Sequence, residues 1–440
     1  MKNIKVGFVS LGCSKNLVVT EEMIGLFKKH GYEIVGNPEE AEVLLINTCG
    51  FIESAKNEGI ETILEMADYK EDGNCKYLIV TGCLVERYEE ELKSELPEVD
   101  LFVSIRDYDR LWEKIDELIN GTKNNDTMNY KNRVLTTGDT MAYLKIAEGC
   151  SNFCTYCAIP YIQGKYVSRK YEDILDEARS LAKKGIKELV VIAQDTTKYG
   201  IDLYGKSRLA ELLADLCKIE DIKWIRFLYS YPESITDELI QVVKKNDKIC
   251  KYFDLPIQHI ADDVLKKMNR KSNGETIRNL ITKLRSEIPG VILRTTLIVG
   301  FPGETEENFN ELCEFVESSK FDRLGAFAYS AEDGTPAAVF KNQVDEDIKE
   351  ARREKIMELQ QKVSIQNLKE KVGNTYECLI ENITDDGEYF IGRSYMDVPS
   401  EDGVIYIKFN NEYMINEFVK VKIVDSLEYD LYGEIVPEEM

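Results

Sequence analysis

The chain has 440 residues, 43% of them hydrophobic, and carries a net charge of −24 at neutral pH. This length predicts two to four domains with substantial cores and excludes a disordered tail. A protein that binds nucleic acid normally presents a basic surface to the phosphates, so this acidic chain argues against nucleic acid as a partner and favours a basic one.

The composition also predicts where the protein works. The N-terminal residues do not resemble a signal peptide, and no apolar run approaches the roughly 18 residues of a membrane span. We therefore expect a cytoplasmic protein that does not contact a membrane. Eleven cysteines in such a chain favour metal ligation over disulfides.

Residues 1–120 alternate apolar strand segments with helices. The predicted strands are residues 6–10, 43–46, 77–80 and 101–103, and the predicted helices are residues 20–30, 54–68, 87–96 and 108–120. Continuous apolar strands that alternate with helices predict an α/β domain with a doubly wound parallel sheet, covered by helices on both faces.

Three of these strands run directly into a cysteine, namely Cys13, Cys49 and Cys83. Because ligands of open α/β sheets bind beyond the carboxyl ends of the strands, we expect the three thiols to converge at one edge. Free cysteines are also common as small core residues, which is the alternative reading. Three cysteines at equivalent positions, two of them after glycine, favour a cluster held by three thiolates.

A polar segment, residues 121–138, reads as a linker to a second series of strands and helices over residues 139–372. Its predicted strands are residues 142–147, 188–193, 224–228, 252–255, 292–299 and 324–329, and a charged helix over residues 351–372 connects it to the C-terminus. Six βα units predict a partial TIM-type barrel, whose chemistry lies at the carboxyl ends of the strands.

The loop after the first barrel strand contains Cys150, Cys154 and Cys157 in a C-x-x-x-C-x-x-C run. Three thiolates on one tight loop can hold three irons of a cubane cluster and leave the fourth iron open. A closed zinc site would need a fourth ligand, and the next candidates, Cys217 and His259, lie far along the chain. Zinc is therefore the weaker alternative.

Polar residues and a glycine on or after later barrel strands are further candidates: Gln194, Arg226, Thr296 and Gly300. The Gly-Phe-Pro-Gly-Glu-Thr run that begins at Gly300 is also an ordinary strand-to-helix turn. His259 follows a barrel strand as well, where it could carry protons or form a hydrogen bond within the wall, and the sequence leaves both readings open.

Residues 373–440 contain short β-branched and aromatic segments separated by turn residues, which predicts a small antiparallel OB-like β-barrel. This segment has 16 acidic and 4 basic residues, a net charge of −12 and half that of the whole chain. Such barrels often bind RNA, but this one lacks the cations to do so. We expect it to dock a basic protein; the alternative is a solvated acidic surface.

The cysteine run, with Tyr156 before its last cysteine, resembles the signature of the radical S-adenosylmethionine (SAM) enzymes. The resemblance implies a 4Fe-4S cluster whose open iron chelates SAM. An electron from the cluster then cleaves SAM to methionine and a 5′-deoxyadenosyl radical. It also implies SAM contacts from the residues after the strands. We expect these from Tyr156, Gln194, Arg226, Thr296 and Gly300.

Two groups of three cysteines on α/β domains, followed by a small TRAM-like barrel, resemble the methylthiotransferases along nearly the whole chain. One branch of that family modifies an adenosine of tRNA, and the RimO type modifies an aspartate of ribosomal protein S-twelve in the small subunit. Residues 10–16, 192–200 and 254–260 are similar to the RimO type. Ser14 departs from that branch, which commonly has proline at this position.

The resemblance implies that Cys13, Cys49 and Cys83 hold an auxiliary 4Fe-4S cluster whose open iron carries a sulfide or methylsulfide co-substrate. The radical would take hydrogen from the aspartate β-carbon, which then collects the sulfur group, and a second SAM would supply the methyl group. An external electron donor is implied. The rivals are the tRNA reaction and a non-catalytic iron–sulfur scaffold on ribosomes, which would form no deoxyadenosine.

Overall fold

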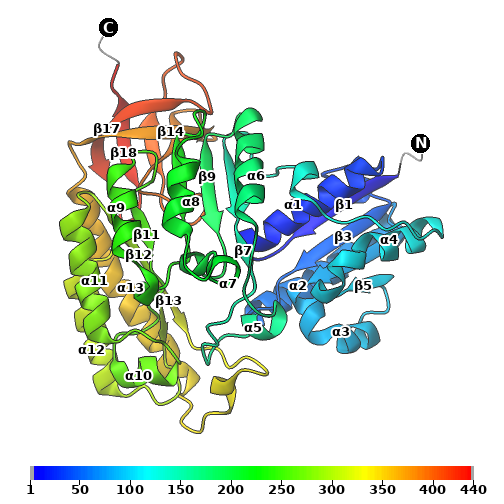
Figure 1. Cartoon of the computed structure of the whole chain (residues 1–440), viewed down its shortest axis with the longest axis horizontal. Coiled ribbons are helices and arrows are strands. Elements are labelled where there is room, and N and C mark those ends of the chain that lie inside the picture. Colours follow the sequence, from blue (N-terminus) through cyan, green and yellow to red (C-terminus); the bar gives the residue numbers. More distant parts are fainter. Residues whose placement is uncertain (1–3, 438–440) are drawn as a thin grey trace. The chain divides into compact units, whose positions relative to one another are not determined.

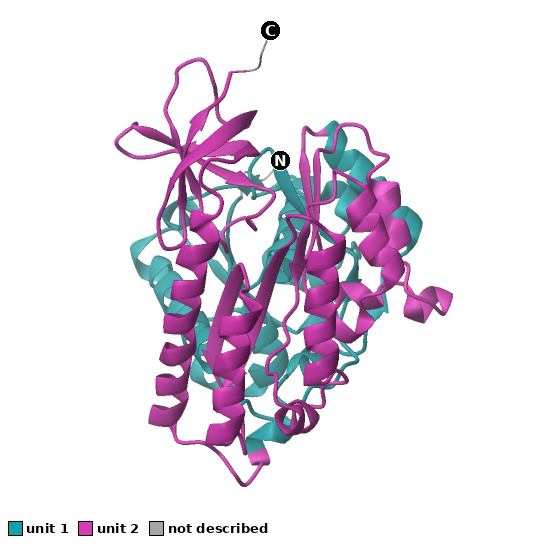
Figure 2. Cartoon of the chain, turned by 90° about the vertical axis from the view of Figure 1, so that its left-hand side faces the viewer, with its two compact units in different colours: residues 1–183, 192–194, 330–338 teal, residues 184–191, 195–329, 339–440 magenta. Residues whose placement is uncertain are grey.

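The structure is a computed structural model in which residues 4–437 are described, and it divides into two compact units (Figure 2). Unit 1 comprises residues 1–183, 192–194 and 330–338. Unit 2 comprises residues 184–191, 195–329 and 339–440.

The N-terminal part of unit 1 is a five-stranded parallel sheet with the strand order β2–β1–β3–β4–β5. Figure 1 labels β1, β3 and β5 of this sheet. Its strands are β1 Lys5–Ser10, β2 Glu33–Ile34, β3 Val43–Thr48, β4 Tyr77–Gly82 and β5 Leu101–Val103. Its helices are α1 Ser14–Lys29, α2 Glu53–Asp72, α3 Cys83–Glu95 and α4 Leu111–Asn120. The predicted α/β fold is confirmed. Only β2 was not predicted, because a two-residue edge strand leaves no apolar run to detect.

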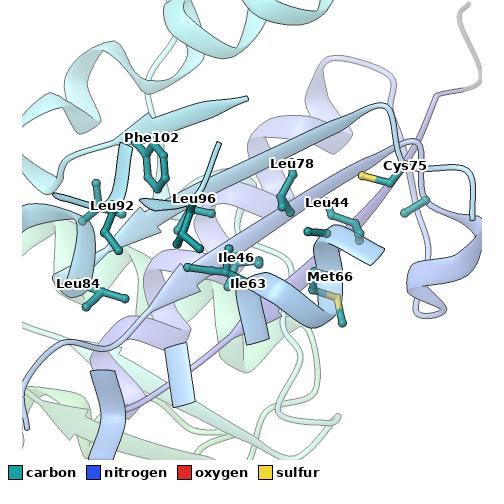
Figure 3. Close-up of a cluster of buried hydrophobic side chains, with 14 residues drawn as sticks. Leu44, Ile46, Ile63, Met66, Cys75, Leu78, Leu84, Leu92, Leu96 and Phe102 are labelled. Carbon is teal, nitrogen blue, oxygen red and sulfur yellow. The ribbon is translucent and has the colours of Figure 1, made fainter. Parts of the chain in front are cut away.

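The two faces of this sheet explain why its central strands are apolar throughout. Leu44 and Ile46 of β3 pack with Ile63 and Met66 of α2 on one face, where α3 also contributes (Figure 3). Val43 and Leu45, the alternate residues of the same strand, pack against α1 and α4 on the other face. Successive side chains of a strand point to opposite faces, so a strand covered on both sides needs hydrophobic residues at every position.

The rest of unit 1 leads to the cysteine loop. Its elements are β6 Met141–Lys145, β7 Ala147–Glu148, α5 Ile159–Ile162, β8 Val167–Ser168 and α6 Tyr171–Lys183. The predicted linker ahead of them is not a loose tether. Its Arg133 is 2% exposed and forms ion pairs with Glu21 of α1 at 2.6 Å and Glu177 of α6 at 2.9 Å.

Unit 2 contains most of the barrel. Its strands are β9 Glu188–Ile192, whose last residue belongs to unit 1, β10 Trp224–Phe227, β11 Tyr252–Asp254, β12 Ile292–Val299 and β13 Arg323–Ala328. Its helices are α7 Ile201–Tyr204, α8 Leu209–Leu216, α9 Asp237–Lys245, α10 Asp262–Lys267, α11 Gly274–Glu287, α12 Glu306–Ser319 and α13 Glu346–Lys369.

These strands pair in parallel and in chain order, which is the arrangement of a TIM-type barrel. β9 pairs with β10, β11 with β12, and β12 with β13, while a single bridge from Ile225 to Ile249 connects the two sets. The charged helix α13 is more than a connector. It buries Ile356, Leu359 and Val363, and it contacts α12 and β13.

A closed five-stranded barrel ends the chain, with the order β14–β15–β16–β18–β17. Its strands are β14 Thr375–Ile383, β15 Tyr389–Ser394, β16 Ile405–Lys408, β17 Phe418–Ser426 and β18 Leu431–Ile435. The predicted small β-barrel is confirmed, and its strand pairs are antiparallel except for β16 and β18, which pair in parallel. A ring with an odd number of strands cannot alternate direction all the way round, so at least one neighbouring pair must be parallel.

Within residues 4–437, no helix is both long enough and apolar enough to cross a membrane.

Candidate functional site

Cys13, Cys49 and Cys83 follow three neighbouring strands of the unit 1 sheet. Ser10 of β1 stands beside Asn47 of β3, and Thr48 of β3 stands beside Gly82 of β4. Parallel neighbours in this register end at the same edge, so the three cysteines emerge together beyond it. The topology thus brings together residues that lie 36 and 34 positions apart in the chain.

Two glycines make this convergence possible. Gly12 has φ +85°, and a Cβ atom there would lie 2.6 Å from the Cβ of Cys49. Gly82 has φ +102°, and a Cβ atom there would lie 2.3 Å from the carbonyl oxygen of Thr48. Both positions need the left-handed backbone region and leave no room for a side chain. The Gly-Cys pairs in the sequence are therefore a steric requirement of the site.

The electrostatics of this edge fit a metal cluster. Burial raises the pKa of Cys83, and together with the neighbouring thiolates of Cys49 and Cys13 it brings this pKa to about 12. Burial and Cys13 likewise raise the pKa of Cys49. Three thiolates this close repel one another, whereas bound iron would hold all three deprotonated. The donor set therefore suits a cationic iron–sulfur core.

The second group of cysteines lies on one loop that folds back on the segment after α5. The backbone N–H of Cys150 donates to the carbonyl oxygen of Gly164 at 3.1 Å, and that of Cys157 donates to Cys154 at 3.0 Å. Gly149 has φ +66°, and a Cβ atom there would lie 2.2 Å from the carbonyl oxygen of Lys165. These contacts fix a tight loop with Cys150 and Cys154 buried and Cys157 half-buried.

Across residues 4–437, no three Cys, His, Asp or Glu side chains stand where they could share one metal ion. The three thiolates of a cubane cluster bind three separate irons, so they need not meet at a single point. The assignment of the two groups therefore rests on the convergence of their backbones and on their shared chemistry.

Unit 1 places the two groups near each other. Cys83 packs against Ala158 and Ile162, which directly follow the loop that holds Cys150, Cys154 and Cys157. A cavity of about 60 Å³ opens beside them. It is lined by Lys15, Asn16, Val19, Ile105, Tyr108, Lys145, Ala147, Glu148, Gln163 and Gln194. This volume has room for only a few atoms.

One ion pair in the wall of this cavity joins a buried lysine to an exposed glutamate. The ammonium group of Lys145 is 2.5 Å from a carboxylate oxygen of Glu148. Burial opposes the charge of Lys145, but Glu148 outweighs that effect and the pKa of the lysine is raised. Lys145 in turn lowers the pKa of Glu148. The pair therefore stays ionised around neutral pH.

Four of the residues that we expected to contact SAM are half-buried side chains or turn residues in the two units. In unit 1, Tyr156 is half-buried on the cysteine loop, and Gln194 is half-buried directly after β9. In unit 2, Thr296 is half-buried on β12, and Gly300 follows that strand with φ +69°. The side chain of Glu304 accepts the N–H of Gly300 at 2.8 Å, so this turn has a structural role as well.

Arg226 lies in a different setting. Its guanidinium is fully buried, is 3.1 Å from Glu188 and donates to the carbonyl oxygen of Tyr395 at 2.8 Å. Arg393 of the small barrel pairs with the same Glu188 at 2.6 Å. Arg226 therefore ties the sheet to the C-terminal barrel, and its guanidinium is engaged by these structural partners.

His259 is fully buried in the barrel wall. Its Nδ1 accepts the backbone N–H of Ala261 at 3.0 Å, and its Nε2 lies 3.5 Å from a carboxylate oxygen of Glu304. These contacts agree with the alternative in which His259 forms hydrogen bonds within the barrel wall.

Gln163 was missed by sequence reasoning. It follows the four-residue helix α5, and no motif or periodicity marks it. Its side chain reaches Cys83 and Gln194, contacts that appear only once the chain is folded.

Family models match three parts of the chain: the uncharacterized protein family UPF0004 over residues 5–104, the radical SAM superfamily over residues 144–316, and the TRAM domain over residues 372–436. A protein of Alkaliphilus oremlandii named ribosomal protein uS12 methylthiotransferase RimO is 63% identical over 99% of this chain and 100% of its own length. A Clostridioides difficile protein of the same name is 54% identical over 99% of both chains.

Among solved structures, the radical SAM methyltransferase TsrM of Kitasatospora setae is similar over 77% of both chains, with a TM-score of 0.58 and 13% identity. At this identity the likeness shows a shared fold only. The radical SAM match implies that the chain uses SAM and a 4Fe-4S cluster.

Proposed function

The chain belongs to the RimO family of ribosomal protein uS12 methylthiotransferases, and from this premise we propose that it adds a methylthio group to uS12. The observation that carries the proposal is 63% identity to a RimO protein along the whole chain, across both cysteine groups and the C-terminal barrel. We further propose that the acceptor is the β-carbon of an aspartate.

In this proposal each cysteine group holds one 4Fe-4S cluster. Cys150, Cys154 and Cys157 would hold the cluster that supplies an electron for cleavage of SAM. Cys13, Cys49 and Cys83 would hold a second cluster that presents a sulfide or methylsulfide co-substrate. Burial of the Cys49 and Cys83 thiols and their repulsion by neighbouring thiolates support metal binding at the second group, because bound iron would offset both.

Four residues would help to hold SAM: Tyr156, Gln194, Thr296 and Gly300. Tyr156 and Gln194 belong to the same unit as both cysteine groups. Thr296 and Gly300 lie on and directly after β12, where backbone can approach a flat ligand closely. Lys145 and Glu148 would keep the wall between the cysteine groups polar and ordered.

The charge of the C-terminal barrel supports a basic protein as the substrate. In its described part, nine acidic residues are exposed: Glu377, Asp385, Asp386, Glu388, Glu401, Glu412, Asp425, Glu428 and Glu434. Only three basic residues of the barrel are exposed, namely Lys408, Lys420 and Lys422, while Arg393 is buried in its ion pairs. Such a surface repels the phosphates of tRNA and attracts a basic ribosomal protein, either free or exposed on the small ribosomal subunit.

The test is anaerobic turnover with dithionite as the electron donor, SAM and sulfide, with small ribosomal subunits and bulk tRNA offered in separate reactions. We expect a mass gain on one uS12 peptide that equals replacement of hydrogen by a methylthio group. A gain only on tRNA adenosine would overturn the assigned substrate. Deoxyadenosine without either product would keep SAM cleavage and reject both substrates.

A further inference from the structure

Gln163 connects a cysteine of one group with a residue of the barrel. Its side-chain nitrogen Nε2 lies 3.9 Å from Sγ of Cys83, within hydrogen-bonding distance for sulfur. Its oxygen Oε1 accepts a hydrogen bond of 2.9 Å from Nε2 of Gln194. Since Gln194 already donates to that oxygen, the amide of Gln163 turns its N–H toward the sulfur.

The same short segment also supports the other cysteine group. The carbonyl oxygen of Gly164, the next residue, accepts the N–H of Cys150 at 3.1 Å. The carbonyl oxygen of Lys165 closes off the space beside Gly149. Residues 163–165 therefore contact one cysteine group through backbone atoms and the other through a side chain.

An N–H group that donates to a cluster sulfur affects the redox state of the cluster. A reduced cluster carries one more negative charge than an oxidised one, so the hydrogen bond is stronger in the reduced state and raises the reduction potential. The hydrogen bond from Gln194 polarises the amide of Gln163 and strengthens its donation to sulfur.

We propose that Gln163 is a positioning residue that donates to the Cys83 ligand and raises the reduction potential of the auxiliary cluster, with Gln194 acting through it. The inference rests on the proposed function, because it presumes a cluster at Cys13, Cys49 and Cys83. It predicts that loss of this donor changes the auxiliary cluster selectively and leaves SAM cleavage in place.

The experiment compares Gln163→Leu and Gln163→Glu with wild type, as anaerobically reconstituted full-length protein. Leucine removes the amide, and glutamate keeps its shape and the acceptor for Gln194 but places a negative charge beside the sulfur. Gln366→Leu, at an exposed position on α13, is the matched control. Redox titrations followed by electron paramagnetic resonance give the potential of each cluster, and added SAM identifies the cluster that binds it.

We expect Gln163→Leu to move the potential of the auxiliary cluster to more negative values and Gln163→Glu to move it further. Gln194→Leu leaves Gln163 in place, so its shift should have the same sign and be smaller. The SAM-binding cluster should not change in either Gln163 variant, and the Gln366→Leu control should leave both clusters as they are in wild type. The yield of methylthio product per deoxyadenosine should fall roughly 10-fold in Gln163→Leu, as is common when a hydrogen-bond partner of a metal ligand is lost.

An unchanged auxiliary potential in Gln163→Leu, with both clusters present, would overturn the inference and leave the proposed function intact. If neither Gln163 variant retains the auxiliary cluster, Gln194→Leu decides: a negative shift supports the inference, and no shift rejects it. If wild type itself binds only one cluster, the proposed function fails first.

Discussion

The two cysteine groups contain the same number of thiols, but the chain builds them in opposite ways. Cys150, Cys154 and Cys157 lie within eight residues of one loop, which backbone hydrogen bonds hold in shape. Cys13, Cys49 and Cys83 span 71 residues and meet only because β1, β3 and β4 are neighbours in one sheet. The first group is therefore a local structure, and the second depends on the tertiary fold.

This difference shows which structural changes would disrupt each group of cysteines. A local loop keeps its cysteines together as long as its own turns persist. A group assembled by a sheet is lost whenever strand register or strand packing changes, even if each cysteine remains. Changes to the N-terminal sheet should therefore remove one cluster and spare the other, and the following predictions test that separation.

The largest effect is expected from the cysteines themselves. Cys154→Ala should abolish deoxyadenosine formation, whereas Cys49→Ala should keep it and lose the methylthio product, because only the loop group would act on SAM. Anaerobic assays that quantify deoxyadenosine and modified uS12 check both outcomes. Cys313→Ala, a half-buried cysteine on α12 outside both groups, is the matched control. Full methylthiolation by Cys49→Ala would contradict the division of roles.

Gly82→Ala should have the next largest effect. The new Cβ atom would sit 2.3 Å from the carbonyl oxygen of Thr48 and force β4 away from β3. Backbone strain and overpacking together should cost about 4 kcal/mol of unfolding free energy. The iron content should fall by one cluster while SAM cleavage persists. Denaturant titration and iron assays measure these effects.

Gly121→Ala separates the clash from the backbone strain. Gly121 has φ +67°, but nothing lies within 4 Å of a Cβ atom built there. Its substitution should cost only about 1 kcal/mol and leave both clusters bound. Equal losses in the two variants would show that packing at Gly82 does not build the site.

Glu332→Ala should destabilise unit 1 by a smaller amount. Glu332 is 2% exposed, accepts the N–H of Glu53 at 3.1 Å, and pairs with Lys56 and Arg87, each at 3.2 Å. Arg87 also donates to the carbonyl oxygen of Gly50, the residue after Cys49. Removing the carboxylate takes away the buried acceptor that the half-buried Lys56 and Arg87 share, which should cost about 3 kcal/mol.

Denaturant unfolding of the full-length protein measures this loss, and Glu354→Ala on α13 is a control for losing one carboxylate. If Glu332→Ala lowered stability no more than that control does, the ion pairs around Glu332 would not stabilise the edge of the sheet.

The smallest effect is a pH dependence of the iron-free protein. The pKa of Cys83 is raised from 9.0 to about 12 in the fold, so from about pH 9 upward the unfolded chain releases this proton while the folded chain keeps it. The contribution of Cys83 to stability is present below pH 9 and is lost as the pH rises toward 12. Between pH 9 and 11 we expect a loss of about 2 kcal/mol.

Cys83→Ala should remove this part of the pH dependence, as measured by denaturant titrations of both iron-free proteins at several pH values. Parallel curves for the two proteins would show that Cys83 is not held protonated by its surroundings.

The sequence predicted both cysteine groups for different reasons. The loop group follows from spacing alone. The dispersed group could be predicted because Gly12 and Gly82 mark turns after apolar strands, and parallel strands end at a common edge. The strand order that makes β1, β3 and β4 neighbours came from the structure.

What could not be predicted depends on long-range side-chain contacts. The network of Glu188, Arg226 and Arg393 joins residues up to 205 positions apart. The sequence around Arg226 therefore could not show that its partners are structural. Gln163 lies 80 residues from Cys83, directly after a helix that is too short to show a pattern. The parallel pair in the C-terminal barrel could not be predicted either, because local alternation of residues identifies strands but not the direction in which they pair.

The most direct test of the central claim is the iron and acid-labile sulfide content of reconstituted wild type and of a variant with Cys13, Cys49 and Cys83 all changed to alanine. The account predicts about eight irons per wild-type chain and about four in the variant, which should still cleave SAM. Four irons in both proteins would contradict it, because the converging thiols of the sheet would then hold no cluster.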